Sequence, residues 1–280
     1  MKTYLDCIPC FFRQGLEAIR MTTGDEAKHR KVLFEIAKVI PEFPLNSTPP
    51  EMGKIIHKIV HQFTDSSDPY REIKNRHNKM ALELYPELKE KAKRAEDPLL
   101  MAIRIAIAGN VIDLGAGSEV NIKKELKKIL HQNFAILDYD RFKESLKNTD
   151  EILYIADNAG EVVFDRILIE SLKKRVIYAV RDKPIINDAT IDDALFCKMD
   201  EVAEVISSGC DAPGTILREC SGEFLSHYNK SKLIISKGQG NYETLSQEKK
   251  PIFFLLKAKC PVIARDLKCK LGDIILKAQM

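Results

Sequence analysis

The stretch Ile152-Leu153-Tyr154-Ile155-Ala156-Asp157-Asn158-Ala159-Gly160-Glu161 decides the fold. Its five apolar residues, followed at once by polar residues and glycine, predict a buried strand over 152–156 that ends in a loop. The pattern over 162–173 then predicts a helix, and a second apolar run over 175–180 predicts the next strand. Strand, helix and strand in this order indicate a parallel sheet with helices on both faces.

The same alternation continues towards the C-terminus. Further strands are expected at 204–206, 233–236 and 262–264, the run 252–256 is ambiguous, and helices are expected at 188–199 and 213–228. Up to residue 147 the pattern is helical instead. We therefore expect an α/β protein with a Rossmann-like parallel sheet flanked by helices. Its N-terminal all-helical region, 1–147, would pack over the strand ends of an α/β domain, 148–280.

Local signals place several helices in the first half. Asp6 is expected to cap the first of them, and Thr48-Pro49-Pro50-Glu51 matches a capping box with proline at the first helical position. The nearly all-apolar run 99–108 predicts a helix that is buried on all sides and ends at Gly109.

Composition excludes several classes of protein. Among 280 residues, 45% are hydrophobic and the net charge is only +3, with Lys and Glu interleaved, so no nucleic-acid partner is expected. No apolar run approaches the roughly 20 residues needed to span a membrane, and the N-terminus lacks a signal-peptide pattern. Seven scattered cysteines indicate a reducing compartment, so we expect a cytoplasmic protein. No feature specifies an oligomeric state.

Polar residues follow each of four expected strands. Asp157-Asn158-Ala159-Gly160-Glu161 follows the first, Asn187-Asp188 the second, Ser207-Ser208-Gly209-Cys210-Asp211 the third, and Lys237-Gly238-Gln239-Gly240-Asn241 the fourth. In an open parallel sheet, ligands bind outside the carboxyl ends of the strands. These loops are therefore expected to form one site.

The residue types point to metal and phosphate. The oxygens of Asp157, Asn158 and Asp188 are hard ligands that suit Mg²⁺, Mn²⁺ or similar ions. Lys237 beside Gly238 and Gly240 would grip a phosphate, with backbone N–H groups approaching it closely. A structural alternative stays open, because Asp-Asn-Ala-Gly is also a good turn and Asp188 a good helix N-cap.

Five ordered motifs resemble those of the damage-control phosphatase family, formerly the domain of unknown function 89 family, in its prokaryotic branch. They are Cys7-Ile8-Pro9-Cys10, Gly109-Asn110-Val111-Ile112-Asp113, Asp157-Asn158-Ala159-Gly160-Glu161, Ile186-Asn187-Asp188-Ala189-Thr190 and Lys237-Gly238-Gln239-Gly240-Asn241.

The resemblance implies a function and a site. It implies a divalent metal (Mn, Co, Ni or Mg) held by Asp157, Asn158 and Asp188, and hydrolysis of small phosphorylated metabolites such as sugar phosphates or damaged phosphometabolites. Asn110 and Asp113 would line the site together with Glu161, Gly238 and Gly240, and Lys237 would face the phosphate. The metal would orient a water for in-line attack, with Asp157 or Asp188 as an alternative nucleophile.

Two alternatives come from other features. Cys7 and Cys10, in a first helical turn, fit a thiol redox or metal-handling protein without phosphatase activity, or a buried packing pair. A methyl-donor-binding carboxyl methyltransferase is the other, although Gly238-Gln239-Gly240 lacks the third glycine of a dinucleotide fingerprint.

Overall fold

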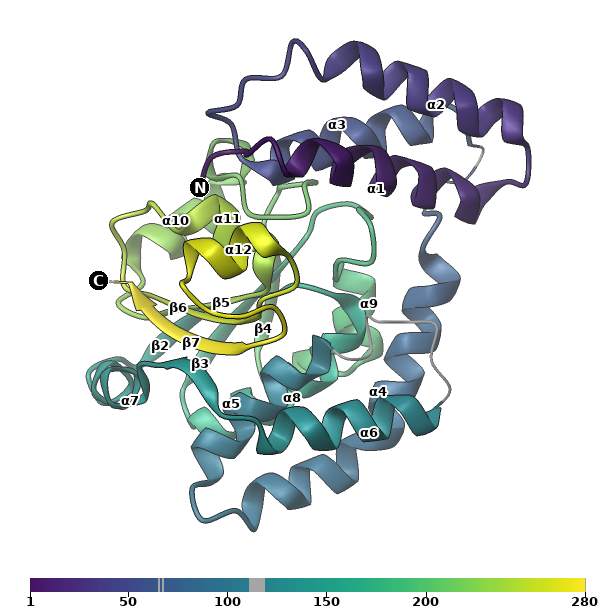
Figure 1. The fold of residues 1–280 in the computed structure, drawn as a ribbon. Coiled ribbons are helices and arrows are strands. Elements are labelled where there is room, and N and C mark those ends of the chain that lie inside the picture. The colour runs from purple at the N-terminus through teal and green to yellow at the C-terminus, as the bar shows by residue number, and fades with distance from the viewer. Residues whose placement is uncertain (65, 67, 111–118, 280) are drawn as a thin grey trace.

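The computed structural model describes residues 1–64, 66, 68–110 and 119–279. Its centre is a seven-stranded sheet in the order β1-β7-β6-β5-β2-β3-β4 (Figure 1). The strands are β1 Phe134–Leu137, β2 Glu151–Ile155, β3 Arg175–Val180, β4 Glu204–Ser207, β5 Ile234–Lys237, β6 Ile252–Lys257 and β7 Ile274–Gln279. Strands β2 to β6 are parallel, whereas β7 runs antiparallel to β6 and β1 runs parallel to β7. The expected class, a mostly parallel α/β sheet flanked by helices, is confirmed.

Helices cover both faces of this sheet. The α-helices are α1 Cys7–Thr22, α2 Glu26–Val39, α3 Pro49–His61, α4 Arg71–Lys93, α5 Pro98–Ala108, α6 Glu119–His131, α7 Tyr139–Lys147, α8 Val162–Leu172, α9 Ile191–Phe196, α10 Gly222–Lys230, α11 Gln239–Leu245 and α12 Pro261–Asp266. Short 3₁₀ helices are η2 Ala159–Glu161, η3 Met199–Glu201 and η4 Leu217–Glu219. Among the described residues, no helix has the length and apolar character to cross a membrane.

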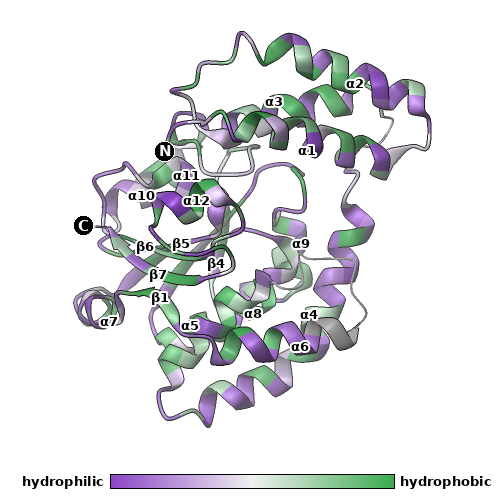
Figure 2. Ribbon diagram, viewed as in Figure 1, coloured by the Kyte–Doolittle hydropathy of each residue, from purple (hydrophilic) through white to green (hydrophobic). Residues whose placement is uncertain are grey.

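Strand β2 shows why both faces are buried. Ile152 and Tyr154 belong to the core cluster under α4, α5 and α8, while Leu153 and Ile155 belong to the cluster under α1, α3 and α10 to α12. Successive side chains of a strand point to opposite faces, so a strand that is apolar over residues 152–155 needs apolar cover on both. Figure 2 shows the mainly hydrophobic central strands between helices of mixed character.

The N-terminal helices α1 to α3 form a separate layer at the top of Figure 1. Ion pairs tie α3 to the segment after β4: Lys54 contacts Asp211 at 2.6 Å and Glu219 at 2.7 Å, and Glu51 pairs with Arg218. The expected capping box of α3 is present, since Glu51 accepts from the Thr48 N–H. The helical layer thus lies against the carboxyl-end loops of the sheet, as predicted.

Four expected features were wrong or incomplete. Residues 262–264 lie in helix α12, because Cys260 caps that helix and Pro261 occupies its first position. Asp6 makes no cap hydrogen bond with its side chain and pairs with Arg265 at 3.0 Å instead. The long helices expected at 188–199 and 213–228 are shortened to α9 and α10, which begin after Thr190 and Ser221.

The sheet also draws a strand from the first 147 residues. Strand β1 lies before the expected division, and it pairs with β7 at the far edge. Neither β1 nor β7 was predicted. The division into 1–147 and 148–280 stays a prediction about domains.

Candidate active site

The carboxyl ends of β2, β3, β4 and β5 meet at one edge of the sheet, and their loops meet there. The backbone of Asp157 accepts from Ala189 N at 2.8 Å, and Ala159 N donates to Asn187 O at 2.8 Å. These bonds place Asn158 opposite Asp188 in an antiparallel bridge. Directly opposite residues of such a pair have neighbouring side chains. The structure therefore brings Asp157, Asn158 and Asp188 together, and all three are buried.

Asp188 does not serve as a helix N-cap. Helix α9 begins three residues later, where Thr190 and Asp193 form the capping box: the Thr190 N–H donates to Asp193 at 3.0 Å. The structural alternative for Asp188 was therefore wrong, and its burial is left to be explained by the site itself.

Asp157 lies directly against Gly238. A Cβ on Gly238 would fall 1.9 Å from Asp157 Oδ2, and the glycine has a φ of +80°. Both the space and the backbone conformation require glycine here. The Gly238 N–H donates to Leu255 O at 3.0 Å. It is therefore not available to a phosphate, contrary to the expectation from sequence.

Gly240 has a similar packing role. A Cβ there would fall 2.0 Å from Pro213 O, in the segment after β4. The two glycines thus serve close packing inside the protein. The methyl-donor alternative stays a prediction.

The carboxylates repel one another. Burial raises the pKa of Asp157 well above its ordinary value, and the nearby charges of Glu161 and Asp188 raise it further. Lys259 and Arg181 act in the opposite direction. A divalent cation would relieve this repulsion, and the donor set of two carboxylates and an amide suits a hard ion.

This donor set differs from the commonest metal centres. In the described part of the chain, no three His, Cys, Asp or Glu side chains are arranged so that they could hold a metal ion. The predicted set contains only two such residues and an asparagine. The role of Asp157, Asn158 and Asp188 as metal ligands stays a prediction.

A buried guanidinium fixes Asp188. Arg181, 1% exposed, donates from Nε to Asp188 Oδ2 at 2.7 Å. Its other nitrogens reach Thr215 at 3.1 Å and Asn241 at 3.0 Å. Asn241 in turn donates to the carbonyl oxygens of Ala156 and Lys237. The Arg181 guanidinium thus connects the segments after β3, β4 and β5 around Asp188.

Lys237 occupies the floor of the site. Its Nζ donates to Glu161 at 2.8 Å and to Asp165 at 2.6 Å, and Asp165 also accepts from Tyr154 and Tyr178. Burial alone would lower the pKa of Lys237, but the two carboxylates outweigh burial and raise it. A permanently charged, buried lysine with two partners favours a positioning role. Direct contact with phosphate stays a prediction.

Glu161 links the helical half to the loop that carries Asp157 and Asn158. Its Oε1 accepts from Asn110 at 2.6 Å and from Asn158 at 2.9 Å. Asn110 thus lies beside Glu161, and the Oδ1 atom of Asn110 is buried without a hydrogen-bond partner in the described part of the chain. Asp113, the other residue expected from that segment, lies outside the described residues.

The cysteine pair gives no sign of a reactive thiol. Cys7 and Cys10 are free, and burial raises the pKa of Cys7. A nucleophilic or metal-binding thiol needs a lowered pKa. The surroundings of Cys7 favour a packing role over the redox alternative.

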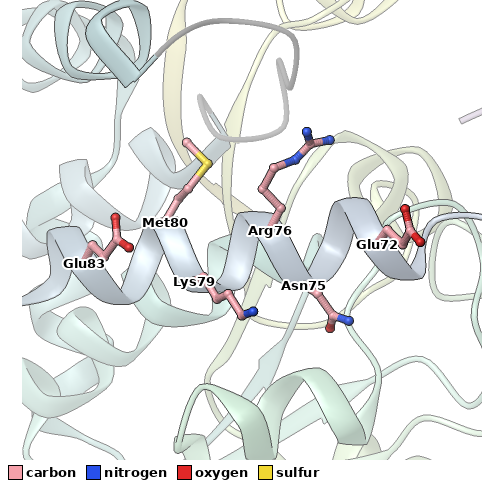
Figure 3. Close-up of a pocket in the computed structure, with 6 residues that line it drawn as sticks. All are labelled: Glu72, Asn75, Arg76, Lys79, Met80 and Glu83. Atoms are coloured by element: carbon pink, nitrogen blue, oxygen red, sulfur yellow. The ribbon is translucent and has the colours of Figure 1, made fainter.

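Two cavities differ in their relation to this site. One, of about 610 Å³, is lined by Arg13, Glu17, Asn110, Lys257, Ala258, Lys259, Leu271 and Gly272, so it adjoins Glu161 through Asn110. The other, of about 460 Å³, lies along the exposed face of α4, where Arg76 and Met80 point to one side of the helix and Asn75 and Lys79 to the other (Figure 3). None of its lining residues belongs to the strand-end loops.

Sequence reasoning placed Asn241 in the expected site loops without a role of its own, and it assigned no role to Arg181 or Asp165. Arg181 directly follows the apolar run 175–180, and a charged residue at that point was a usable signal. Asp165 lies in an apolar helix pattern, and only the fold shows that it faces Tyr154 and Tyr178.

Comparison with known proteins gives a consistent result. Residues 3–275 match the model of the damage-control phosphatase ARMT1-like domain. The damage-control phosphatase of Pyrococcus horikoshii is 37% identical over 98% of this chain and 97% of its own length, and that of Archaeoglobus fulgidus is 34% identical over 97% of both. The crystal structure of a duf89 family protein from Pyrococcus horikoshii superposes with a TM-score of 0.92 at 35% identity, covering 100% of both chains. The family predicted from the ordered motifs is confirmed: this chain belongs to the damage-control phosphatase ARMT1-like domain family.

Proposed function

We propose that this chain is a divalent-metal-dependent phosphatase that acts on small phosphorylated metabolites in the cytoplasm. Its family, and two relatives that carry the name damage-control phosphatase, support hydrolysis of a phosphate ester. One observation carries the metal dependence: the buried side chains of Asp157, Asn158 and Asp188 meet at neighbouring loops, and the carboxylates of Asp157 and Asp188 repel each other.

Asp157, Asn158 and Asp188 would each provide an oxygen ligand to the metal ion. Asp157 is pressed against Gly238, and Asp188 is held by Arg181, so neither carboxylate is free to turn away. The amide of Asn158 directs its Nδ2 towards Asp157 and Glu161, so a metal would bind the carbonyl oxygen. When bound, Mn²⁺, Co²⁺, Ni²⁺ or Mg²⁺ would neutralise phosphoryl charge and acidify water.

Lys259 supplies positive charge on the substrate side. It lines the 610 Å³ cavity, and it stabilises the charge of Asp157. A phosphoryl group bound between Lys259 and the predicted metal position would have its charge compensated from two sides.

We assign the attack on phosphorus to water. In the absence of a cation, the raised pKa of Asp157 favours its neutral form, which is a poor nucleophile. Asp188 has one oxygen engaged by Arg181. Both carboxylates are therefore better suited to holding charge than to forming a bond with phosphorus.

The test is phosphate release from a panel of sugar phosphates by protein that has been stripped with a chelator and then reloaded with each ion. We expect turnover only after reloading, and we expect Asp157→Asn to lose at least about 100-fold. Asp150→Asn is the matched control, because Asp150 is exposed and precedes β2 at the opposite sheet edge. Turnover that persists in the stripped protein and in Asp157→Asn would refute the proposal.

A further inference from the structure

The 610 Å³ cavity beside the candidate site is larger than a phosphate needs and carries an excess of positive charge. Its charged residues come from two places: Arg13 and Glu17 lie on α1, Lys257 is the last residue of β6, and Lys259 follows that strand. Asn110 connects this cavity to Glu161. Three cations thus face one carboxylate in a space of the size that holds a small metabolite.

The protein leaves two of these cations without an acidic partner. In the described residues, neither Lys257 nor Arg13 forms an ion pair, and Arg13 donates a hydrogen bond to the Cys10 sulfur at 3.6 Å. Burial lowers the pKa of Lys257, and the charges of Lys128 and Lys259 lower it further, against the effect of Glu125. Lys257 is therefore a partly buried positive charge without a counter-ion, which is costly, and an anionic ligand would relieve that cost. Arg13 is exposed on α1, so its guanidinium is accessible to such a ligand.

One phosphoryl group does not account for all of this charge. Lys259 and the proposed cation act near Asp157, where the phosphate would lie, whereas Arg13 belongs to α1 on another wall of the cavity. The planar fork of an arginine matches a carboxylate through two parallel hydrogen bonds. Asn110 Oδ1, a buried acceptor without a donor in the described part of the chain, suits a hydroxyl group.

We infer that the preferred substrates are phosphorylated hydroxy acids, of which sugar-acid phosphates are one kind, and that Arg13 selects them by binding the carboxylate. This inference rests on the proposed function for the position of the phosphate. Arg13 is then the specificity-determining residue, and neutral sugar phosphates are bound more weakly.

The experiment compares 6-phosphogluconate with glucose 6-phosphate, which share a phosphorylated six-carbon chain and differ in the carboxylate. Dissociation constants are measured by calorimetry on the metal-free protein, and kcat/KM is measured on the metal-loaded protein. We expect about a tenfold preference for 6-phosphogluconate in both, since a charge-assisted pair contributes about that factor. Arg13→Gln should reduce the preference to about twofold or less, whereas Arg20→Gln, at an exposed position near the end of the same helix, should keep it.

The outcomes separate the two proposals. Equal affinity for the two ligands, no binding of either, or a preference that survives Arg13→Gln would overturn the inference about Arg13. Hydrolysis of both compounds without preference would overturn that inference alone. A binding preference lost in Arg13→Gln, in a protein that releases no phosphate with any metal, would support the inference and refute the phosphatase.

Discussion

Replacing Gly238 with alanine tests the contact that orients Asp157. The new Cβ would lie 1.9 Å from Asp157 Oδ2 and 2.1 Å from Cγ, at a φ of +80°. With a ψ of 168°, Gly238 lies in a backbone region that essentially only glycine adopts, and an L-residue there costs about 1–3 kcal/mol. Displacing a buried side chain costs about 1–3 kcal/mol more. We therefore expect Gly238→Ala to lower the free energy of unfolding by about 2–6 kcal/mol, together with a loss of metal affinity.

Two other glycines separate these contributions. Gly272 has a φ of +90° with no atom within 4 Å of its Cβ position, and Gly222 has the same open space without a positive φ. Gly272→Ala should therefore cost only the backbone strain of about 1–2 kcal/mol. Gly222→Ala should be neutral or stabilise by up to about 1 kcal/mol, because alanine restricts the unfolded chain.

The assay is unfolding in denaturant for the three variants, with Mn²⁺ affinity measured on the same samples. The double variant Gly238→Ala/Asp157→Ala should recover part of the cost, because the atoms that collide with the Cβ are gone. If Gly238→Ala is no more destabilising than Gly272→Ala, Asp157 does not lie against Gly238 and the geometry of the site is wrong.

Three further predictions concern the surroundings of this site. Arg181→Met should destabilise the protein by about 3–5 kcal/mol, because Asp188 would keep a buried charge without its partner; unfolding in denaturant measures this, and a change under about 1 kcal/mol would contradict the assigned ion pair. The pKa of Asp157 is raised in the folded protein, so protonated Asp157 stabilises the metal-free fold below the ordinary carboxyl pKa. This stabilisation is lost as the pH rises through the pKa that Asp157 has in the folded state. The gain in Tm on adding Mn²⁺ should therefore grow between pH 5 and 8 in the natural protein, measured against Asp157→Asn, and an identical pH dependence in both would exclude Asp157 as the source. Cys10→Ser should keep kcat/KM within about twofold in the phosphate-release assay, since packing roles at half-exposed positions contribute little; a large loss with release of bound zinc would favour the metal-handling alternative.

The strands next to the site were predictable because their signals are local. The apolar runs 152–156 and 175–180 correspond to β2 and β3 almost residue for residue, since strands buried on both faces need continuous apolar sequence. The loops after them then follow from the rule for parallel sheets. This is why the sequence could place Asp157, Asn158 and Asp188 at one edge of the sheet.

The remaining features depend on contacts between distant segments. The run 262–264 is as apolar as a buried strand, but the Cys260 cap and Pro261 at the first helical position favour helix α12. Strand β7 is antiparallel to β6 in a sheet otherwise expected to be parallel, so no alternation predicted it. The position of Lys237 depends on Asp165, 72 residues away in the chain, and no spacing rule connects the two.

The central claim is that Asp157, Asn158 and Asp188 hold one divalent cation. Anomalous diffraction from crystals soaked in Mn²⁺ tests it most directly. We predict a single strong anomalous peak within roughly 2.0–2.6 Å of an oxygen from each of the three side chains, and its absence in Asp157→Asn crystals treated in the same way. A peak bound by other residues, or none at millimolar Mn²⁺, would contradict the account.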